Sequence, residues 1–494
     1  MASVHPVQSA RSQFLTKLFY GSGSLAFGVK DNGFNVLLLL YYNQVLGLPA
    51  SWAGSALALA LVVDSVVDPL IGYASDNTRS RWGRRHPYMY AAAIPASLSY
   101  LLLWMPPAHL GNLSLLAYLF VTTVLVRSFI TVYEIPSAAL GPELNRDYDE
   151  RTSYMSFRYL FGWVGGVTMY VLAFAVFLRP DATHPVGQLN PHGYHTYAIA
   201  AAIVMFVSIL SSSIGTHSAI PYLKTPPARP RIPFGQVARE IGGVLGNKSA
   251  AVLLGFGIVS GVSAGVTFAL QAYFSTFFWQ LPAQNIAVLG LGSYVSAFGA
   301  MVAAPRLSKR LGKKRALITV AIISAILGPS TLILRLLGFF PENNSAFLVP
   351  LMLVMGIVTV GLSIVPPILA ASMMSDVVED NQVKSGRRSE GVLFAANAFL
   401  LKCVSGLGLL AGSFVLSMVH FPQGAKPGHV APEVLSRLAL VDICALAVLN
   451  AIAIALVAGY TITRAKHAAN LETLDATAAE LVTQDPRLHV AGPH

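Results

Sequence analysis

The stretch Ala60-Leu-Val-Val-Asp64-Ser-Val-Val-Asp68-Pro-Leu-Ile-Gly72 places two carboxylates four residues apart in an apolar run that begins near Trp52. The segment that follows, Asp76-Asn-Thr-Arg-Ser-Arg-Trp-Gly-Arg-Arg85, is strongly charged. A long apolar run closed by basic residues is typical of a membrane span. A charged side chain at the bilayer centre costs about 2.5–3.5 kcal/mol on insertion scales, so the two carboxylates indicate a functional site.

The composition identifies an integral membrane protein. The 494 residues are 54% hydrophobic and 11% charged, with a mean hydropathy of +0.61, whereas a soluble domain carries about 25% charged residues. The net charge of +11 does not indicate a nucleic-acid partner, because the Lys and Arg residues gather in alternate loops. Cys403 and Cys444 lie within apolar segments and are interpreted as small core residues rather than a disulfide.

Twelve apolar segments are long enough to span a bilayer, which needs about 20 residues each. We therefore predict an all-α membrane protein with twelve transmembrane helices. The predicted spans are 18–45, 52–75, 87–106, 113–139, 153–178, 195–219, 249–278, 284–305, 315–337, 347–375, 390–418 and 437–463.

The chain divides into two halves of six spans. The basic connection between them contains Thr-Pro-Pro-Ala-Arg-Pro-Arg-Ile-Pro, which cannot continue a helix and reads as a linker. Arg81-Trp-Gly-Arg-Arg85 after span 2 recurs as Arg310-Leu-Gly-Lys-Lys314 after span 8. Repeated six-helix halves are the architecture of major facilitator transporters. The predicted parts are an N-terminus 1–17, a bundle 18–219, a linker 220–248, a bundle 249–463 and a tail 464–494.

The loops predict how the chain lies in the membrane. Loops near 79–85, 224–248, 306–315 and 384–388 are rich in Arg and Lys, whereas loops near 46–51, 107–112 and 280–284 contain none. The basic loops and both termini are therefore expected in the cytoplasm. The first apolar run is followed by many others, so it is interpreted as a span rather than a signal peptide.

Eight ionisable residues stand out within the predicted spans, and Asp64 and Asp68 are the most informative. Their spacing places them on one helix face about 6 Å apart. Two carboxylates this close in a low dielectric cannot readily both stay ionised, so the pair must bind a proton or share a cation. This predicts a site for a coupling ion, H⁺ or Na⁺. The alternative is a structural salt bridge to a nearby Arg, and the two interpretations are not exclusive.

Span 4 presents a second polar face, because Arg127, Thr131 and Glu134 follow the spacing of one helical stripe. The Thr131 hydroxyl is a suitable ligand for a small cation, or alternatively bonds to its own helix. Glu134 precedes Pro136, where the helix loses a backbone hydrogen bond. Arg127 is interpreted as the partner of an aspartate in preference to a contact with the substrate.

Spans 5 and 11 each contain a basic residue, near the start of span 5 and deep within span 11. Arg158 precedes Gly162, Gly165 and Gly166, which permit close helix packing, and it either faces the bundle or snorkels to the surface. Lys402 lies thirteen positions into span 11, too deep for easy snorkelling. A lysine facing the bundle there needs a carboxylate, and Asp64 and Asp68 are the candidates.

Lys30 and Asp31 lie together in the middle of span 1. Adjacent helical residues point about 100° apart, so both face a cavity only if it is wide. Asp31 is a candidate to accept paired hydroxyls of a polar substrate. A Lys30–carboxylate pair that fixes the helix position is the alternative.

The charged residues that follow span 2 are interpreted as a gating latch. Arg79, Arg81, Arg84 and Arg85 are expected to hydrogen-bond the span ends and Asp76, and to set topology and gating rather than bind substrate. A matching latch is expected in the second half. It comprises Asp376, Glu379 and Asp380 with Lys384, Arg387 and Arg388.

Together these residues resemble the glycoside–pentoside–hexuronide:cation symporter family of the major facilitator superfamily. The resemblance covers nearly all of the twelve-span region and is weak in spans 6, 9 and 12. It is carried by Lys17-Leu-Phe-Tyr20-Gly21, Lys30-Asp31, Asp64 to Pro69, Arg79 to Gly83, Glu134-Ile-Pro136, Glu150-Arg151-Thr152, Arg158, and Glu390-Gly391 leading to Lys402.

The resemblance implies roles for individual residues. Asp64 and Asp68 would bind the coupling cation with the hydroxyl of Thr131, and Lys402 would lie near that site. Asp31, Glu134 and Arg158 would bind sugar hydroxyls.

Two departures from the family pattern bear on the ion and the substrate. Melibiose permease, a member of the family, has an amide just before the second aspartate, where this chain has Val67. Valine offers no oxygen, so proton coupling gains weight over Na⁺. The aromatic residues that melibiose permease has in spans 4 and 10 are also missing from this chain. The alternatives for stacking on a sugar ring are Tyr133, Tyr273, Phe278 and Trp279.

The sequence thus predicts a secondary active transporter, a sugar or glycoside:cation symporter working by alternating access in a bacterial inner membrane. It is expected to have no cofactor beyond the coupling ion and to function as a monomer among membrane lipids. The alternative is a symporter of the same fold for an amphiphile such as a lysolipid. A membrane-embedded enzyme is disfavoured, because no His-Glu-x-x-His motif or nucleophile–base constellation is found, and no signalling domain indicates a sensor.

Overall fold

The computed structural model describes residues 10–144, 148–222, 247–385, 404, 406–470 and 472–473. Regular secondary structure within these ranges is entirely helical. Nine helices of the described residues are long and apolar enough to cross a membrane. They coincide with predicted spans 2, 4 to 10 and 12, which confirms the all-α membrane class.

The three other predicted spans are less complete. Span 1 is built from the consecutive segments α1, α2, η1, α3 and η2, and span 3 corresponds to α5 (His86–Leu103). Of span 11, the described part is an apolar helix at Gly406–Met418. The total of twelve spans therefore stays a prediction.

The chain folds as two compact units. Unit 1 comprises 1–229, 268–290 and 412–430, and unit 2 comprises 230–267, 291–411 and 431–494. The predicted linker 220–248 lies mostly outside the described residues. Two pieces of the predicted second bundle, 268–290 and 412–430, belong to unit 1.

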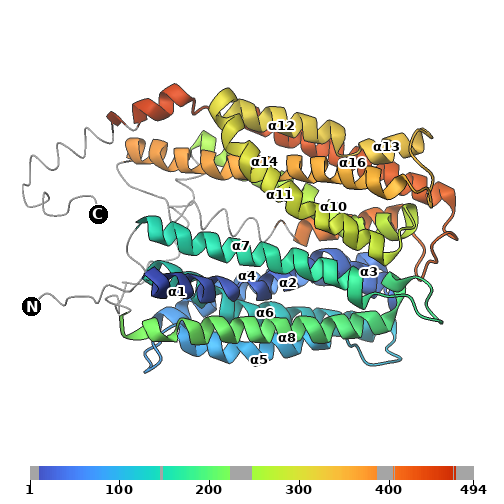
Figure 1. Ribbon diagram of the computed structural model, residues 1–494, viewed down its shortest axis with the longest axis horizontal. Coiled ribbons are helices and arrows are strands. Elements are labelled where there is room, and N and C mark those ends of the chain that lie inside the picture. The colour runs from blue at the N-terminus through green and yellow to red at the C-terminus, as the bar shows by residue number, and fades with distance from the viewer. Residues whose placement is uncertain are drawn as a thin grey trace, which may run out of the picture. The chain divides into compact units, whose positions relative to one another are not determined.

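The helices of unit 1 run side by side in Figure 1, from α1 to α8. Their bounds are α1 Ala10–Ser22, α2 Leu25–Asn32, η1 Gly33–Leu37, α3 Leu38–Leu40, η2 Tyr41–Val45, α4 Ala50–Asn77, α5 His86–Leu103, α6 Asn112–Leu144, α7 Tyr148–Leu172, η3 Ala173–Phe177, η4 Gly187–Leu189, α8 Pro191–Gly215, η5 His217–Tyr222 and η6 Phe274–Phe278. We call the end of the helices near loop 78–85 the basic end, and the other end the opposite end.

Glycines allow α2 and α7 to pack with their backbones almost in contact. A Cβ on Gly28 would lie 1.9 Å from the carbonyl oxygen of Gly162, and a Cβ on Gly166 would lie 3.0 Å from the carbonyl oxygen of Gly28. A Cβ on Gly165 would meet Leu25 at 2.9 Å. The predicted role of these glycines in close helix packing is confirmed.

The basic motif that follows span 2 and recurs after span 8 is also repeated in backbone geometry. Gly83 and Gly312 occupy the same place in the two basic motifs and have φ of +72° and +78°. An L-residue with a side chain rarely adopts this conformation, so both motifs require glycine. The equivalent backbone turns support the division of the chain into two repeats.

A second echo at the opposite ends was not found by sequence reasoning. Leu48-Pro49-Ala50 after span 1 recurs as Leu281-Pro282-Ala283 after span 7. Each is preceded by a π-helical turn, with Leu46 N donating to Tyr41 O at 3.0 Å and Trp279 N to Phe274 O at 2.9 Å. The Leu-Pro-Ala repeat is visible in the sequence, but the hydrophobic pattern of a span does not show that its last turn is π-helical. The equivalence of the two turns is therefore seen only in the structure.

Buried amides tie the opposite end of span 1 to the later segments of unit 1. Asn43 and Gln44 are 2% and 5% exposed. Tyr273 Oη donates to Asn43 Oδ1 at 2.8 Å. Gln44 Nε2 donates to Pro422 O at 3.0 Å, and Ala425 N donates to Gln44 Oε1 at 2.9 Å. These bonds explain why 268–290 and 412–430 belong to unit 1.

Unit 2 has its own apolar core. Its helices are α10 Lys248–Tyr273 (which runs on into unit 1), α11 Ala283–Leu311 (which begins in unit 1), α12 Lys313–Leu327, α13 Ser330–Leu336, α14 Leu348–Ser385 and α16 Pro432–Ala458. Phe256, Leu317, Met373 and Val457 are among the buried side chains that these helices share. Cys444 on α16 is a free thiol, as predicted, but it is exposed, so its assignment to the core is wrong.

Candidate functional site

Asp64 and Asp68 meet the hydroxyl of Thr131 between α4 and α6. Thr131 Oγ1 lies 3.1 Å from Asp64 Oδ1 and 2.9 Å from Asp68 Oδ1. Thr131 is 2% exposed and Asp64 is 5% exposed. The alternative in which Thr131 bonds to its own helix is not the arrangement found, because the hydroxyl bridges the two carboxylates.

Arg127 completes this group from one turn away on α6. Its Nη1 donates to Asp64 Oδ2 at 3.2 Å, and its guanidinium lies over the ring of Phe34 at 5.5 Å. Arg127 and Asp64 are both largely buried, with side-chain exposures of 14% and 6%. The predicted Arg–aspartate pair is confirmed, and it coexists with the bridging hydroxyl.

Pro69 frees one backbone oxygen of α4 from its usual helical hydrogen bond. Proline lies within this helix directly after Asp68 and has no N–H to offer the carbonyl of Ser65, four residues earlier. The Ser65 hydroxyl itself donates to Val62 O at 2.7 Å. Val67 supplies no side-chain oxygen. The oxygens that meet at the two aspartates are thus those of two carboxylates and one hydroxyl.

Arg158 and Glu134 meet at a second polar position between α6 and α7. Arg158 is 7% exposed, so it faces the bundle rather than snorkelling. Its Nη1 donates to Ser137 Oγ at 2.8 Å, and its Nη2 to the backbone oxygen of Glu134 at 3.4 Å. Its guanidinium lies 5.2 Å from the ring centre of Phe27. No hydrogen bond or ion pair to another described residue occupies the Glu134 carboxylate.

Asp31 stands apart from this pair. Lys30 Nζ lies 2.6 Å from Asp31 Oδ1, and the Asp31 side chain is 56% exposed. The adjacent residues therefore pair with each other. No contact among the described residues joins Asp31 to Glu134 or Arg158.

The four aromatic alternatives for sugar stacking are all buried. Tyr133 and Tyr273 are 1% and 0% exposed, and Phe278 and Trp279 are 8% and 4% exposed. Tyr273 belongs to the amide contacts at the opposite end. Tyr133 lies against Gly23, where a Cβ would come within 1.6 Å of its hydroxyl oxygen.

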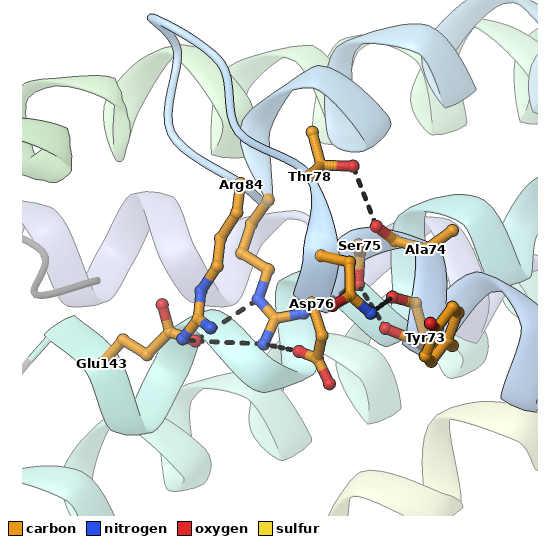
Figure 2. A network of polar contacts seen from close by, with 10 residues as sticks. Tyr73, Ala74, Ser75, Asp76, Thr78, Arg84 and Glu143 are labelled. Atoms are coloured by element: carbon orange, nitrogen blue, oxygen red, sulfur yellow. Dashed lines mark hydrogen bonds and ion pairs between the residues drawn. The ribbon is translucent and has the colours of Figure 1, made fainter. Parts of the chain in front are cut away.

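The basic end carries a charged network that Figure 2 shows around Glu143. Arg84 Nη2 donates to Glu143 Oε1 at 2.6 Å, and Arg85 Nη2 donates to the same oxygen at 3.2 Å. Arg85 also pairs with Asp76 and donates to Ser75 Oγ at 2.7 Å. The predicted contacts of Arg84 and Arg85 with the span ends and Asp76 are found.

Two arginines of the predicted latch lie outside this network. Arg79 and Arg81 are exposed, and the guanidinium of Arg81 lies 5.6 Å from the ring centre of its neighbour Trp82. Glu143, which sequence reasoning missed, takes the central place. It follows Gly141-Pro142 at the end of span 4, so its position at a span end was the available signal.

A buried histidine adjoins the same end of unit 1. His86 is 0% exposed, and its Nε2 lies 3.0 Å from Thr216 Oγ1. Its ring is 5.7 Å from that of His217. Burial, and secondarily His217, lower the pKa of His86 to about 4. His86 is therefore neutral at pH 7.

In unit 2, the acidic residues near the end of α14 also have basic partners. Lys313 Nζ lies 2.6 Å from Asp376 Oδ1, and Lys466 Nζ lies 3.0 Å from Asp380 Oδ1. His467 Nδ1 lies 2.9 Å from Glu379 Oε2. The sequence had predicted different partners for these acids, namely Lys384, Arg387 and Arg388. The side chain of Lys384 is not described. Those two arginines and Lys402 lie outside the described residues.

Comparison with known proteins places the chain in a family. The family described as MFS/sugar transport protein matches residues 19–464. Similar proteins include the inner membrane symporter YicJ of Escherichia coli (strain K12), at 24% identity over 81% of each chain. The isoprimeverose transporter of Lactiplantibacillus pentosus is 24% identical over 82% of this chain and 81% of its own. The lactose permease of Leuconostoc lactis is 24% identical over 81% of this chain and 62% of its own.

The fold has counterparts among solved structures. The inward open conformation of the xylose transporter XylE from E. coli superimposes with a TM-score of 0.55 at 14% identity. The alignment covers 88% of this chain and 95% of that one. The likeness supports the major facilitator fold, and the named symporters confirm the resemblance found in the sequence. The chain belongs to the MFS/sugar transport protein family, within the glycoside–pentoside–hexuronide group of major facilitator symporters.

Proposed function

We propose that the chain is a secondary active sugar or glycoside:cation symporter of a bacterial inner membrane, working by alternating access and not as an enzyme. The family and the names of the relatives support a transporter of small sugars. The nine membrane-length helices of the described residues support a multi-pass membrane protein. Cytoplasmic termini and function as a monomer remain part of the proposal.

One observation carries the cation half of the proposal, namely the Thr131 hydroxyl between Asp64 and Asp68. A hydroxyl has one hydrogen, so it donates to one carboxylate at a time. The second contact of about hydrogen-bond length is favourable only if that carboxyl carries a proton or a cation joins the oxygens. The geometry thus supports a site that takes up one positive charge.

The charges of the two aspartates lead to the same result. Asp64 and Asp68 both contact the Thr131 hydroxyl, so their carboxylates lie close together in a largely buried site. A proton or a Na⁺ bound there reduces the repulsion between them, which a low-dielectric environment favours. Binding of the ion therefore removes an electrostatic penalty and favours close approach of α4 and α6.

The donor set fits a proton more fully than Na⁺. A proton needs one carboxylate and one acceptor, which the Asp–Thr contacts supply. A Na⁺ would be held by Asp64, Asp68 and Thr131, without the oxygen of an amide such as melibiose permease has just before its second aspartate. We therefore propose proton coupling first, with Na⁺ as the second arm of the test.

The sugar half of the proposal rests on Arg158, Glu134 and Asp31. A sugar presents neighbouring hydroxyls that both accept and donate hydrogen bonds. The Glu134 carboxylate accepts from such groups, and Arg158 donates to them. Asp31 is placed on α2 with an exposed carboxylate and is proposed as a further acceptor. Lys402 is proposed to lie near the ion site, as the resemblance implies.

A second candidate, transport of an amphiphile, is favoured by one apolar pocket. A cavity of about 380 Å³ lies between α4 and α6, lined by Trp52, Ser55, Ala56, Leu59, Leu113, Leu116, Ala117 and Phe120. It suits an acyl chain rather than a sugar. No residue proposed here for ion or sugar binding lines it.

The test measures uptake into proteoliposomes from a panel of mono-, di- and oligosaccharides, with and without Na⁺ and at two pH values. We expect accumulation driven by a proton gradient, and its loss in Asp64→Asn. Asp181→Asn, which alters a carboxylate in the exposed segment before α8, is the control. Stimulation by Na⁺ at constant pH would assign the site to Na⁺. Intact concentrative uptake by Asp64→Asn would contradict the ion assignment, and a lysolipid as the transported compound would support the second candidate.

A further inference from the structure

A carboxylate in the last span is buried without a partner for one of its oxygens. Asp442 lies on α16, ten residues after Pro432, which places it about 15 Å along the helix. It is 5% exposed, and its Oδ1 has no hydrogen-bond partner among the described residues. Leu438 and Ala439, one turn earlier on the same face, are fully buried. Asp442 therefore points into the protein rather than into lipid.

The charged residues of α16 itself do not compensate Asp442. Glu433 and Arg437 are both exposed and lie towards the start of the helix. They precede Asp442 by nine and five residues, and neither separation is the three or four residues that places side chains side by side.

The helices packed against α16 bring no counter-charge to this level within the described part of the chain. On α12, Lys313 pairs with Asp376, and Lys314 donates to Ala458 O near the other end of α16. Arg315 follows Lys314 at that same end of α12. On α13, Arg335 donates to Pro341 O at 2.7 Å.

The charged groups of α10 and α14 also lie away from Asp442. α10 meets α16 where Gly255 faces Leu456, and the charged residue of α10 is Lys248, at the start of that helix. The acidic group of α14 lies near Tyr460, beyond the end of α16, since Tyr460 Oη donates to Met373 O. Asp442 is thus separated along α16 from the ion pairs of unit 2.

An ionised carboxylate in such a place is costly. Desolvation of an unpaired charge at membrane depth costs several kcal/mol, whereas the protonated acid is neutral and also becomes a donor. The surroundings of Asp442 therefore favour the acid form. Because no ion pair of the described residues holds this carboxyl, a structural salt bridge does not account for its presence.

We propose that Asp442 is a second, reversible proton-binding site, located in unit 2 and separate from the Asp64–Asp68–Thr131 group of unit 1. The carboxylate takes a proton from hydronium, giving the carboxylic acid and water, when α16 is packed as described here. It releases that proton when water reaches this face of the helix. The protein consequently binds protons at Asp442 whichever ion occupies the first site.

The test is an infrared titration of the full-length protein in lipid nanodiscs between about pH 5 and about pH 9, a range that spans the shifts usual for buried carboxyls. We expect a C=O stretching band of a protonated carboxyl that disappears as the pH rises. Asp442→Asn should remove the part of this band that belongs to Asp442. Asp64→Asn, which alters the first site, and Glu433→Gln, which alters a carboxylate nearer the start of the same helix, should both keep that part. Asp442→Glu should shift the band without removing it, and it guards against misfolding of the Asn variant.

Two results would overturn the inference. One is a titrating spectrum in Asp442→Asn that is identical to that of the unaltered protein. The other is a band of Asp442 that stays constant over the whole pH range, since a permanently neutral acid is a structural group. Neither readout requires a transported sugar, so failure here is distinguishable from failure of the proposed function.

Discussion

Glu143→Gln is the perturbation for which the structure gives the clearest magnitude. The Glu143 carboxylate accepts from Arg84 at 2.6 Å and from Arg85 at 3.2 and 3.3 Å, all at Oε1. Glutamine keeps the size of the side chain but removes its charge. Arg85, with a side-chain exposure of 6%, then keeps Asp76 as its remaining carboxylate partner among the described residues.

Removing one partner of a buried ion pair costs about 3–5 kcal/mol. The retained amide oxygen still accepts one hydrogen bond, so the lower end, about 3 kcal/mol, is expected. For a domain of roughly 150–250 residues, each kcal/mol lowers Tm by about 2–4 °C. The expected loss is therefore about 6–12 °C in detergent, measured by intrinsic fluorescence during heating.

Asp76→Asn is the matched control, because it removes the other carboxylate that contacts Arg85. The Asp76 side chain is 58% exposed, and solvent-exposed pairs contribute about 1 kcal/mol or less. We expect a loss of about 4 °C at most. If Asp76→Asn lowers Tm as much as Glu143→Gln, burial does not decide the strength of this network and the reasoning is refuted.

Three further outcomes are expected. Thr131→Val removes the acceptor of the protonated carboxyl, a hydrogen bond worth about 0.5–1.5 kcal/mol, so the pH midpoint of uptake should fall by up to about one unit, and an unchanged midpoint would separate the hydroxyl from ion binding. His86 has a pKa of about 4 in the folded protein and about 6.5 in the unfolded chain, so the free energy of unfolding should fall by about 3 kcal/mol as the pH drops from about 6.5 to about 4. The Tm of His86→Gln should depend less on pH over that range. Gly28→Ala should lower Tm and yield because its Cβ meets a backbone oxygen, whereas Gly356→Ala, with nothing within 4 Å, should not; equal effects would argue against tight α2–α7 packing.

The ion site could be predicted from the sequence because its signals are local. Asp64 and Asp68 share a face by spacing, and Arg127 and Thr131 are one turn apart on span 4. The cost of charge in an apolar segment then requires the two faces to meet. The contacts of Asp64 with Thr131 and Arg127 show that they do.

The remaining contacts could not be predicted, for physical reasons that differ between them. Glu143 lies at a span end, where hydropathy does not distinguish a buried carboxylate from a solvated one. Asn43 and Gln44 are neutral, so their burial leaves no charge signal. Asp442 is a single acid in an apolar run without a charged residue three or four positions away, so span 12 alone does not indicate what the carboxylate contacts.

The amide contacts at the end of span 1 have a consequence for how the protein is made. Gln44 finds its partners at Pro422 and Ala425, and Asn43 finds Tyr273. During synthesis, the first span thus enters the membrane hundreds of residues before these groups exist. Until then the chain offers these amides only the local bonds from Asn43 Nδ2 to Leu48 O and from Gln44 Nε2 to Asn43 Oδ1. Their other hydrogen bonds depend on water or on the insertion machinery, since lipid offers none. The first six spans are therefore an incomplete product that the seventh and eleventh finish, and separately expressed halves should each be short-lived until they assemble.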